Sequence, residues 1–169
     1  RDPISKEIGK TIIFCVSQSH ARKITQLMNE YAHEFFPGIY NSDFATQITS
    51  NVRDAQPFTI QFSNNNLGGN SRLLEGYKTS KTRICITVGM MTTGYDCPDL
   101  LNICLMRPIF SPQDFVQIKG RGTRKYVFSF ADGDIEPTEK DKFKLFDFLS
   151  EEKINISSGK TIFHLSVSS

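Results

Sequence analysis

The stretch that decides the fold reads Ser111-Pro112-Gln113-Asp114-Phe115-Val116-Gln117-Ile118-Lys119-Gly120-Arg121-Gly122-Thr123-Arg124. Ser111 is a residue type that caps helices. Pro112 follows at the first helical position, where its missing N–H costs no hydrogen bond. Phe115 and Ile118 would point away from the polar positions of such a helix, towards a core. We therefore predict a helix over residues 111–124.

Three polar side chains share one face of this predicted helix. Gln117, Arg121 and Arg124 follow the spacing i, i+4 and i+7. A solvated basic face would show the same spacing. Gly120 and Gly122, however, each cost about 1 kcal/mol relative to alanine inside a helix, which indicates close approach of a ligand or of a neighbouring backbone. Two guanidinium groups beside two glycines are what the binding of a polyphosphate requires.

The pattern Gln117-x-x-Gly120-Arg121-x-x-Arg124 resembles motif VI of superfamily 2 helicases and translocases. The longer string over residues 115–124 is most similar to the motor (R) subunit of type I restriction enzymes. The resemblance implies that Arg121 and Arg124 are catalytic arginine fingers on the γ-phosphate of ATP. It also implies that Gln117 organises this contact and that Gly120 lies beside the nucleotide.

A second motif follows a predicted buried strand over residues 83–88. The loop after it reads Gly89-Met90-Met91-Thr92-Thr93-Gly94-Tyr95-Asp96-Cys97-Pro98-Asp99 and resembles motif V of the same superfamily. Loops at the carboxyl ends of strands are where open α/β sheets bind ligands. The resemblance implies that Gly94 and Asp96 contact the nucleotide, with Asp96 on the ribose hydroxyls, and that Thr92 or Thr93 couples the nucleotide to DNA. A polar loop with an Asx turn at Asp96 is the alternative.

The remaining elements alternate between strands and helices. Residues 10–16 contain a continuous run of β-branched and aromatic residues without alternation, which is typical of a buried parallel strand. Ser17 or Ser19 can cap the helix after it, in which Ile24, Leu27, Met28, Tyr31 and Phe35 recur at helical spacing. By the resemblance, Ser17 and Gln18 occupy motif IV, which faces the nucleic-acid backbone; as a plain alternative, Ser17 is only a cap.

Further elements complete a sheet. We predict strands over residues 44–49, 83–88 and 101–106 and a short helix around residues 73–77, while residues 54–62 fit either a strand or a helix. This order predicts an α/β fold: a three-layer RecA-like domain with a parallel sheet and helices on both faces. We assign residues 1–130 to this second RecA-like motor domain. We assign residues 131–169 to a C-terminal extension with predicted strands over 143–149 and 160–167.

Composition is that of a soluble globular protein, with 38% hydrophobic and 22% charged residues among 169. A net charge of +2 is too small to indicate nucleic-acid binding by itself, so any DNA contact would be local. No apolar run is long enough to span a membrane. The four cysteines lack CxxC spacing, which predicts buried thiols, no metal site and a cytoplasmic location.

The sequence does not contain all the motifs that a complete ATPase requires. Gly9-Lys10-Thr11 and Gly159-Lys160-Thr161 lack the second glycine of a phosphate-binding loop. In the family, that loop and the Mg²⁺ ligands lie on a preceding RecA-like domain, with ATP between the two domains. Because the chain begins with Arg1 rather than Met, we expect a fragment of a longer protein. Since it would supply arginine fingers without the phosphate-binding loop, we expect it to be inactive alone.

The resemblance thus implies a motor domain of a type I site-specific deoxyribonuclease that translocates along double-stranded DNA. ATP and Mg²⁺ are the implied cofactors, and the implied partners are DNA, the preceding RecA-like domain, and the specificity and methyltransferase subunits. Another superfamily 2 DNA repair or RNA helicase is one alternative. A RecA-like interaction domain without catalysis is the alternative from a different class.

Overall fold

The structure is a computed structural model that describes residues 1–40, 42–48, 55–71, 73–89, 96–130, 135–149 and 162–164. The strands of the central sheet are β1 (Thr11–Cys15), β2 (Ala45–Gln47), β3 (Ile84–Thr87), β4 (Asn102–Met106), β7 (Lys144–Asp147) and β8 (Ile162–His164). A separate antiparallel pair consists of β5 (Val127–Phe128) and β6 (Thr138–Glu139). The helices are α1 (Gln18–Phe35), α2 (Ala55–Ser63) and α3 (Pro112–Gly122).

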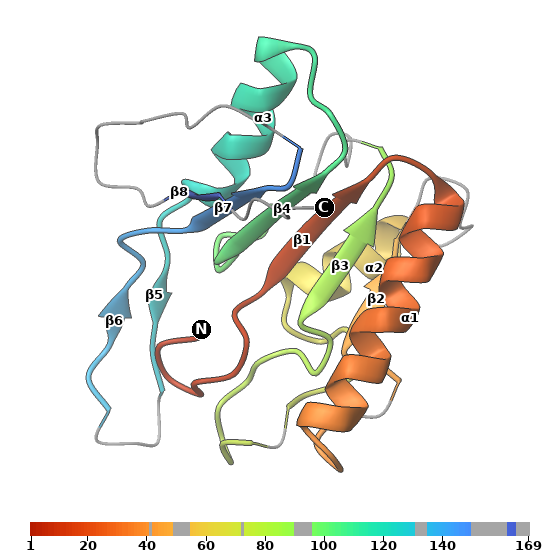
Figure 1. Ribbon diagram of the computed structural model, residues 1–169. Coiled ribbons are helices and arrows are strands. Elements are labelled where there is room, and N and C mark those ends of the chain that lie inside the picture. The colour runs from red at the N-terminus through yellow and green to blue at the C-terminus, as the bar shows by residue number, and fades with distance from the viewer. Residues whose placement is uncertain are drawn as a thin grey trace.

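The central sheet has the order β2-β3-β1-β4-β7-β8, and its strand pairs are all parallel (Figure 1). From β1 the chain moves outwards to β2 and returns to β3. It then crosses to β4, on the other side of β1. The carboxyl ends of β1, β3 and β4 consequently lie next to one another at one edge of the sheet. The predicted C-terminal extension contributes β7 and β8 to this same sheet; the domain boundary after residue 130 stays a prediction.

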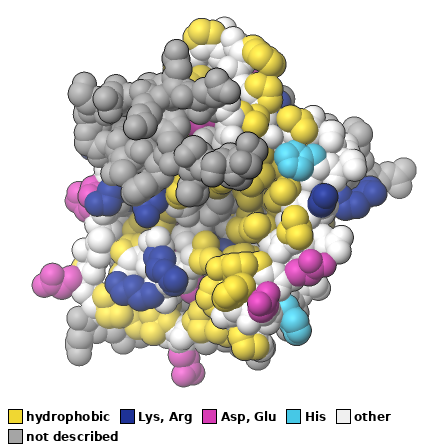
Figure 2. All heavy atoms as spheres, in the orientation of Figure 1, with side chains coloured by type: hydrophobic (Ala, Val, Ile, Leu, Met, Phe, Trp, Pro, Cys, Tyr) yellow, Lys and Arg dark blue, Asp and Glu magenta, His cyan; other side chains and the backbone are white. Residues whose placement is uncertain are grey.

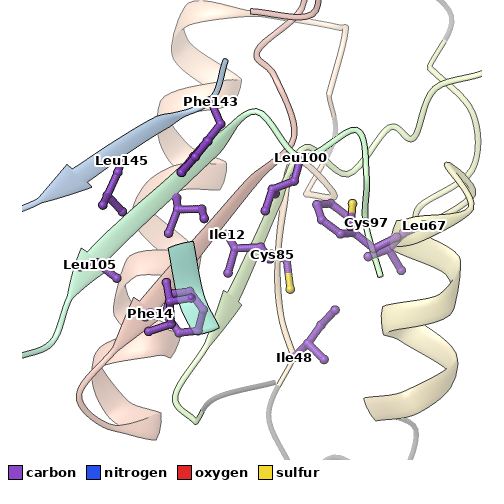
Figure 3. Close-up of a cluster of buried hydrophobic side chains, with 13 residues drawn as sticks. Ile12, Phe14, Ile48, Leu67, Cys85, Cys97, Leu100, Leu105, Phe143 and Leu145 are labelled. Atoms are coloured by element: carbon purple, nitrogen blue, oxygen red, sulfur yellow. The ribbon is translucent and has the colours of Figure 1, made fainter. Parts of the chain in front are cut away.

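Side chains of β1 alternate between two hydrophobic cores. Ile12 and Phe14 belong to the cluster shown in Figure 3, which also receives Phe62 of α2 and Ile118 of α3. Ile13 and Cys15 belong to the opposite cluster, against which residues of α1 pack. Because both faces are covered, a strand of continuous apolar residues is stable here. The predicted three-layer α/β fold is confirmed.

Helix α1 begins where predicted. The Ser17 hydroxyl caps it by accepting a hydrogen bond from the backbone N–H of His20 at 3.1 Å. Ile24 and Met28 pack against the core, as the helical spacing predicts. Leu27, Tyr31 and Phe35 instead lie 44%, 43% and 56% exposed. Figure 2 shows the face of the molecule that carries α1, with hydrophobic side chains gathered among charged ones.

Two further local expectations are settled by the structure. Residues 55–63 form a helix, because Phe58 and Phe62 point to the core at a spacing of four while Ile60 between them is exposed. The helix predicted around residues 73–77 is wrong. The described residues of this segment form turns, closed by a bridge between Asn70 and Ser80, and Gly76 has a φ of +80°, which a right-handed helix excludes.

A buried arginine fastens the N-terminal segment to the sheet. Arg83, only 1% exposed, donates through Nε to the Ile8 carbonyl at 2.7 Å and through Nη1 to the Ser80 carbonyl at 3.1 Å. Its Nη2 lies 3.6 Å from an oxygen of the buried Asp2 carboxylate. Residues 2–8 are thereby held against the amino-terminal end of β3.

All four cysteines are free thiols in the interior, with Cys104 half-buried. Burial raises the pKa of Cys15 to about 11 and that of Cys104 to about 12, from an ordinary value of 9.0. At pH 8 we expect no thiol of the native protein to react rapidly with Ellman's reagent, and all four to react once the chain is unfolded. Unfolded thiols ionise first, so these groups should make stability fall as pH rises from about 9 to 11. A fast-reacting native thiol would contradict the packing.

Candidate functional site

Helix α3 is held in one rotational setting by its buried face. Its cap is Ser111, whose hydroxyl accepts from the Asp114 backbone N–H at 3.3 Å. Ile118 is 1% exposed within the core. Near the end of the helix, a Cβ added to Gly122 would lie 2.3–2.5 Å from ring atoms of the buried Phe143. Gly122 therefore allows a close approach between α3 and the strand β7 that follows Phe143.

The opposite face of α3 is open. Gln117 and Gly120 are exposed, and a Cβ built on Gly120 meets no atom within 4 Å. Arg121 is half-buried. Gln117 and Arg121 lie one turn apart in the carboxyl-terminal half of α3, as their spacing predicts, and Gly120 stands between them in the chain. An open glycine surface beside a guanidinium group fits a phosphate-bearing ligand, because backbone can approach the ligand without a side chain between them.

Arg124 lies outside the helix, which corrects the predicted span of 111–124. Helix α3 ends at Gly122. Thr123 forms the C-cap, where its hydroxyl donates to the Gly120 carbonyl at 2.8 Å. A helix that continued to Arg124 would place this guanidinium on the face of Gln117. The early end instead leaves Arg124 on the segment that leads towards β5.

Arg124 meets a residue of the second motif. Its Nε lies 3.5 Å from Oδ1 of Asp96, and the two side chains are 62% and 61% exposed. An exposed pair of this kind contributes only ~0–1 kcal/mol to stability. The contact nonetheless joins two residues that the sequence analysis assigned to one nucleotide site from separate motifs. Both charges remain accessible to a ligand.

The turn that carries Asp96 is held by contacts with residues that the sequence analysis missed. The Ser63 hydroxyl at the end of α2 donates to the Asp96 carbonyl. Lys140 donates to the Pro98 carbonyl at 2.7 Å, and burial lowers the pKa of this lysine to about 8 although the neighbouring Cys97 and Asp99 act in the opposite direction. These contacts join positions distant in the chain, so no local pattern could have indicated them.

Lys10 belongs to the same support. Its ammonium group lies 3.0 Å from Oδ2 of the buried Asp99. A Cβ added to Gly9 would lie 2.8 Å from Leu101, so the backbone before Lys10 is packed against protein. The Gly9-Lys10-Thr11 string is therefore an interior support, in agreement with the prediction that it is not a phosphate-binding loop.

The carboxyl edge of the sheet carries the other predicted group. Ser17 is exposed but uses its hydroxyl as the α1 cap, and the Gln18 side-chain oxygen accepts from Gln47 Nε2 at 2.8 Å. Thr92, Thr93 and Gly94 lie outside the described residues. At the end of β4, Arg107 donates to the Val88 carbonyl at 3.1 Å and so joins the ends of β4 and β3.

The described residues lack two further kinds of feature. Among them, no group of three or more His, Cys, Asp or Glu side chains could hold a metal ion. No helix within the described ranges is both long enough and apolar enough to cross a membrane.

The parallel sheet, its two helical layers and the helix after β4 define a RecA-like α/β domain. No protein-family model matches the chain. The chain is 27% identical over 147 residues to the type I restriction enzyme EcoKI endonuclease subunit of Escherichia coli strain K12, covering 86% of this chain and 11% of that protein. It is 22% identical over 157 residues to the Saccharomyces cerevisiae protein IRC3, named as an ATP-dependent helicase, covering 93% of this chain and 18% of the yeast protein.

A solved structure agrees with these relatives. A fragment from Vibrio vulnificus YJ016, named as an HsdR subunit of a type I restriction enzyme, is similar with a TM-score of 0.50 and 29% sequence identity, over 70% of this chain and 21% of that one. The chain thus spans a small part of the length of each relative. The predicted resemblance to superfamily 2 helicases, and in particular to the type I restriction R subunit, is confirmed. The chain resembles a helicase-like motor domain.

Proposed function

We propose that the chain is the second motor domain of an ATP-dependent double-stranded DNA translocase, of the kind found in type I restriction-modification enzymes. The observation that carries this proposal is the contact between Arg124 and Asp96, which joins the two motifs just after the end of α3. The open Gly120 and the half-buried Arg121 precede Arg124 within the last turn of that helix. The relatives supply the reaction class: one is named a restriction endonuclease subunit and another an ATP-dependent helicase.

In this proposal Arg124 changes partner during the cycle. Without nucleotide it rests on Asp96, in a contact weak enough to exchange. When the preceding domain closes with ATP bound, Arg124 and Arg121 approach the γ-phosphate and stabilise the charge that develops in the transition state. Asp96 is then free to accept hydrogen bonds from the ribose hydroxyls, and Gln117 orients the arginine contact.

DNA would lie along the carboxyl edge of the sheet. Ser17 and Gln18 stand at the end of β1, and Thr92 and Thr93 belong to the loop after β3. Open α/β sheets bind ligands at this edge. Because this loop connects the carboxyl edge of the sheet with Asp96, a change at the nucleotide would alter the contacts of the loop with duplex DNA.

The remaining assignments of the proposal concern the whole enzyme. ATP is the substrate, and Mg²⁺ would be held by ligands on the preceding RecA-like domain of the same polypeptide. The specificity and methyltransferase subunits would select the DNA site, and the complete enzyme would act in the cytoplasm as a deoxyribonuclease. This chain alone would hydrolyse little ATP.

Two other functions remain distinguishable by experiment. A different superfamily 2 helicase, acting in DNA repair or on RNA, would use the same arginines and the same fold, and the similarity to the yeast protein favours keeping it as the second candidate. A RecA-like interaction domain without catalysis would have no use for the exposed Arg124–Asp96 pair or for an open glycine within α3.

ATP hydrolysis by the full-length protein, with and without duplex DNA, tests the proposal. We expect strong stimulation by duplex DNA, and only background turnover from the 169-residue chain alone. Stimulation by RNA but not by duplex DNA would replace the restriction motor by an RNA helicase. If the protein hydrolysed no ATP under any condition, the interaction domain without catalysis would be the function that fits.

Binding of duplex DNA tests the proposed DNA edge. Replacing Gln18 by alanine should weaken DNA binding by the full-length protein about 3- to 10-fold, the value of one hydrogen bond to a neutral group. The slope of affinity against salt should not change, since an amide neutralises no phosphate. Gln26→Ala removes the same chemical group from a position two turns along α1 and should leave binding unaltered. Equal losses in both variants would remove Gln18 from the DNA contact.

A further inference from the structure

A buried ion pair lies beneath the proposed nucleotide site. Lys10 and Asp99 are 1% and 6% exposed, and Lys10 Nζ lies 3.1 Å and 3.0 Å from the two carboxylate oxygens. The same ammonium group donates to the Phe62 carbonyl and lies 3.4 Å from the Ser63 carbonyl. One lysine at the beginning of β1 is thereby bonded to the end of α2 and to the turn before β4.

The described contacts of this turn act on its backbone and on its buried side chains. Cys97 Sγ donates to Asp99 Oδ1 at 3.1 Å, and the Cys97 side chain lies in the core cluster of Figure 3. The Cys97 carbonyl accepts from the Leu100 N–H at 3.1 Å. Ser63 holds the Asp96 carbonyl and Lys140 the Pro98 carbonyl. The Asp96 side chain is exposed and faces Arg124, whereas those of Cys97 and Asp99 are buried.

The charge of this pair is not needed to fill the core. Two charges removed from water lose solvation that their mutual attraction only partly returns, so well-packed apolar side chains of similar volume often serve equally well. Apolar residues cannot make directional contacts. The ammonium group, in contrast, donates hydrogen bonds to specific oxygen atoms on two elements at once. The pair therefore fixes the place of the turn relative to the end of α2.

We infer that Lys10 and Asp99 are positioning residues for Asp96, which hold its carboxylate where it can accept the ribose hydroxyls of ATP. The inference rests on the proposed function and deepens it. Lys10 and Asp99 touch no nucleotide themselves; they act through the turn. Loss of the pair should therefore damage recognition of the ribose while Arg121 and Arg124, carried by α3 and the segment after it, continue to act.

The ratio of kcat/KM for ATP to that for 3′-deoxy-ATP, measured in the full-length protein, reports this contact. We expect the wild-type ratio to be about 10 or more, since a buried or charged acceptor left unpaired is costly. In the double variant K10M/D99L, which leaves no unpaired charge, the ratio should fall to within about threefold of 1. Its kcat at saturating ATP should stay within about threefold of wild type.

A double variant that folds and keeps the wild-type ratio would show that the pair only holds the fold together. A wild-type ratio near 1 would overturn the inference by removing Asp96 from the ribose. That result would leave the motor function itself standing if Arg124→Ala still abolished turnover. The two failures are thus distinguishable.

A milder variant keeps the inference testable if the double variant does not fold. Ser63→Ala removes the hydroxyl that donates to the Asp96 carbonyl and buries no charge. It should lower the ratio about threefold. The matched control is Ser42→Ala, in an exposed position before β2, which should leave the ratio unchanged. An unchanged ratio in Ser63→Ala, with the protein folded, would overturn the inference.

Discussion

Replacing Arg124 by alanine in the full-length protein is expected to lower DNA-stimulated ATP turnover by roughly 10³-fold or more, the scale on which arginine fingers act in phosphoryl transfer. The KM for ATP should change much less, because the guanidinium group would act on charge that develops in the transition state. Arg124→Lys should recover little activity, since an ammonium group lacks the planar fork. The measurement is steady-state ATP hydrolysis with saturating duplex DNA.

Lys125→Ala is the matched control, because it removes a neighbouring exposed cation from the same segment. It should retain nearly full turnover. Unfolding cannot account for the expected loss in Arg124→Ala, since its exposed pair with Asp96 is worth only ~0–1 kcal/mol, and the melting temperature of the variant should confirm this. Equal turnover in Arg124→Ala and wild type would exclude Arg124 from the chemistry.

Arg121→Ala should cause a comparable loss, with one difference. Arg121 is half-buried on α3 and has contacts within the protein, so its removal should also lower stability. A loss of turnover in this variant is therefore interpretable only at a temperature where circular dichroism shows it to be folded. Full turnover in a folded Arg121→Ala protein would show that Arg121 is not an arginine finger and would leave Arg124 in that role alone.

The elements that could be predicted are those fixed by local signals. The apolar run of β1, the Ser17 cap of α1 and the Ser111-Pro112 start of α3 each lie within a few residues of the structure they determine. The prediction of a helix around residues 73–77 was wrong because Gly76 takes a left-handed conformation, which hydrophobic spacing does not reveal. The predicted end of α3 was wrong for a similar reason. The sequence pattern continues to Arg124, but the hydroxyl of Thr123 caps the helix earlier.

The site could be predicted in part. The resemblance to motifs V and VI assigned Asp96 and Arg124 to one site, and the structure has the two side chains in contact, while their role at a nucleotide stays a prediction. The supporting Lys10–Asp99 pair could not be predicted, because 89 residues separate the two partners and only the fold brings them together. Arg83 opens the predicted strand over residues 83–88, but the pattern does not reveal its partners, which come from residues 2–8 and 79–80 and allow its burial. The pattern of a strand or helix indicates which of its own side chains are buried. It does not indicate which residue from a distant part of the chain will pack against them.

The two glycines of α3 look alike in the sequence and should respond in opposite ways to substitution by alanine. Gly122→Ala places a methyl group 2.3–2.5 Å from the ring of the buried Phe143, far inside van der Waals contact. Overpacking of a core costs about 1–3 kcal/mol. For a chain of this size, that lowers the melting temperature by on the order of 5 °C. Thermal unfolding followed by circular dichroism measures the change.

Gly120→Ala should instead stabilise the protein by up to ~1 kcal/mol, because alanine is the better helix former and the added methyl meets no atom within 4 Å. If that open space is where a phosphate approaches, the same variant should lose ATP turnover by about 10-fold or more despite its higher melting temperature. Stability and activity would then move in opposite directions in a single variant, which a purely structural glycine cannot produce. A Gly120→Ala protein that is more stable and fully active would show that nucleotide does not contact this face of α3, and would shift the proposed phosphate site towards Arg121 and Arg124 alone.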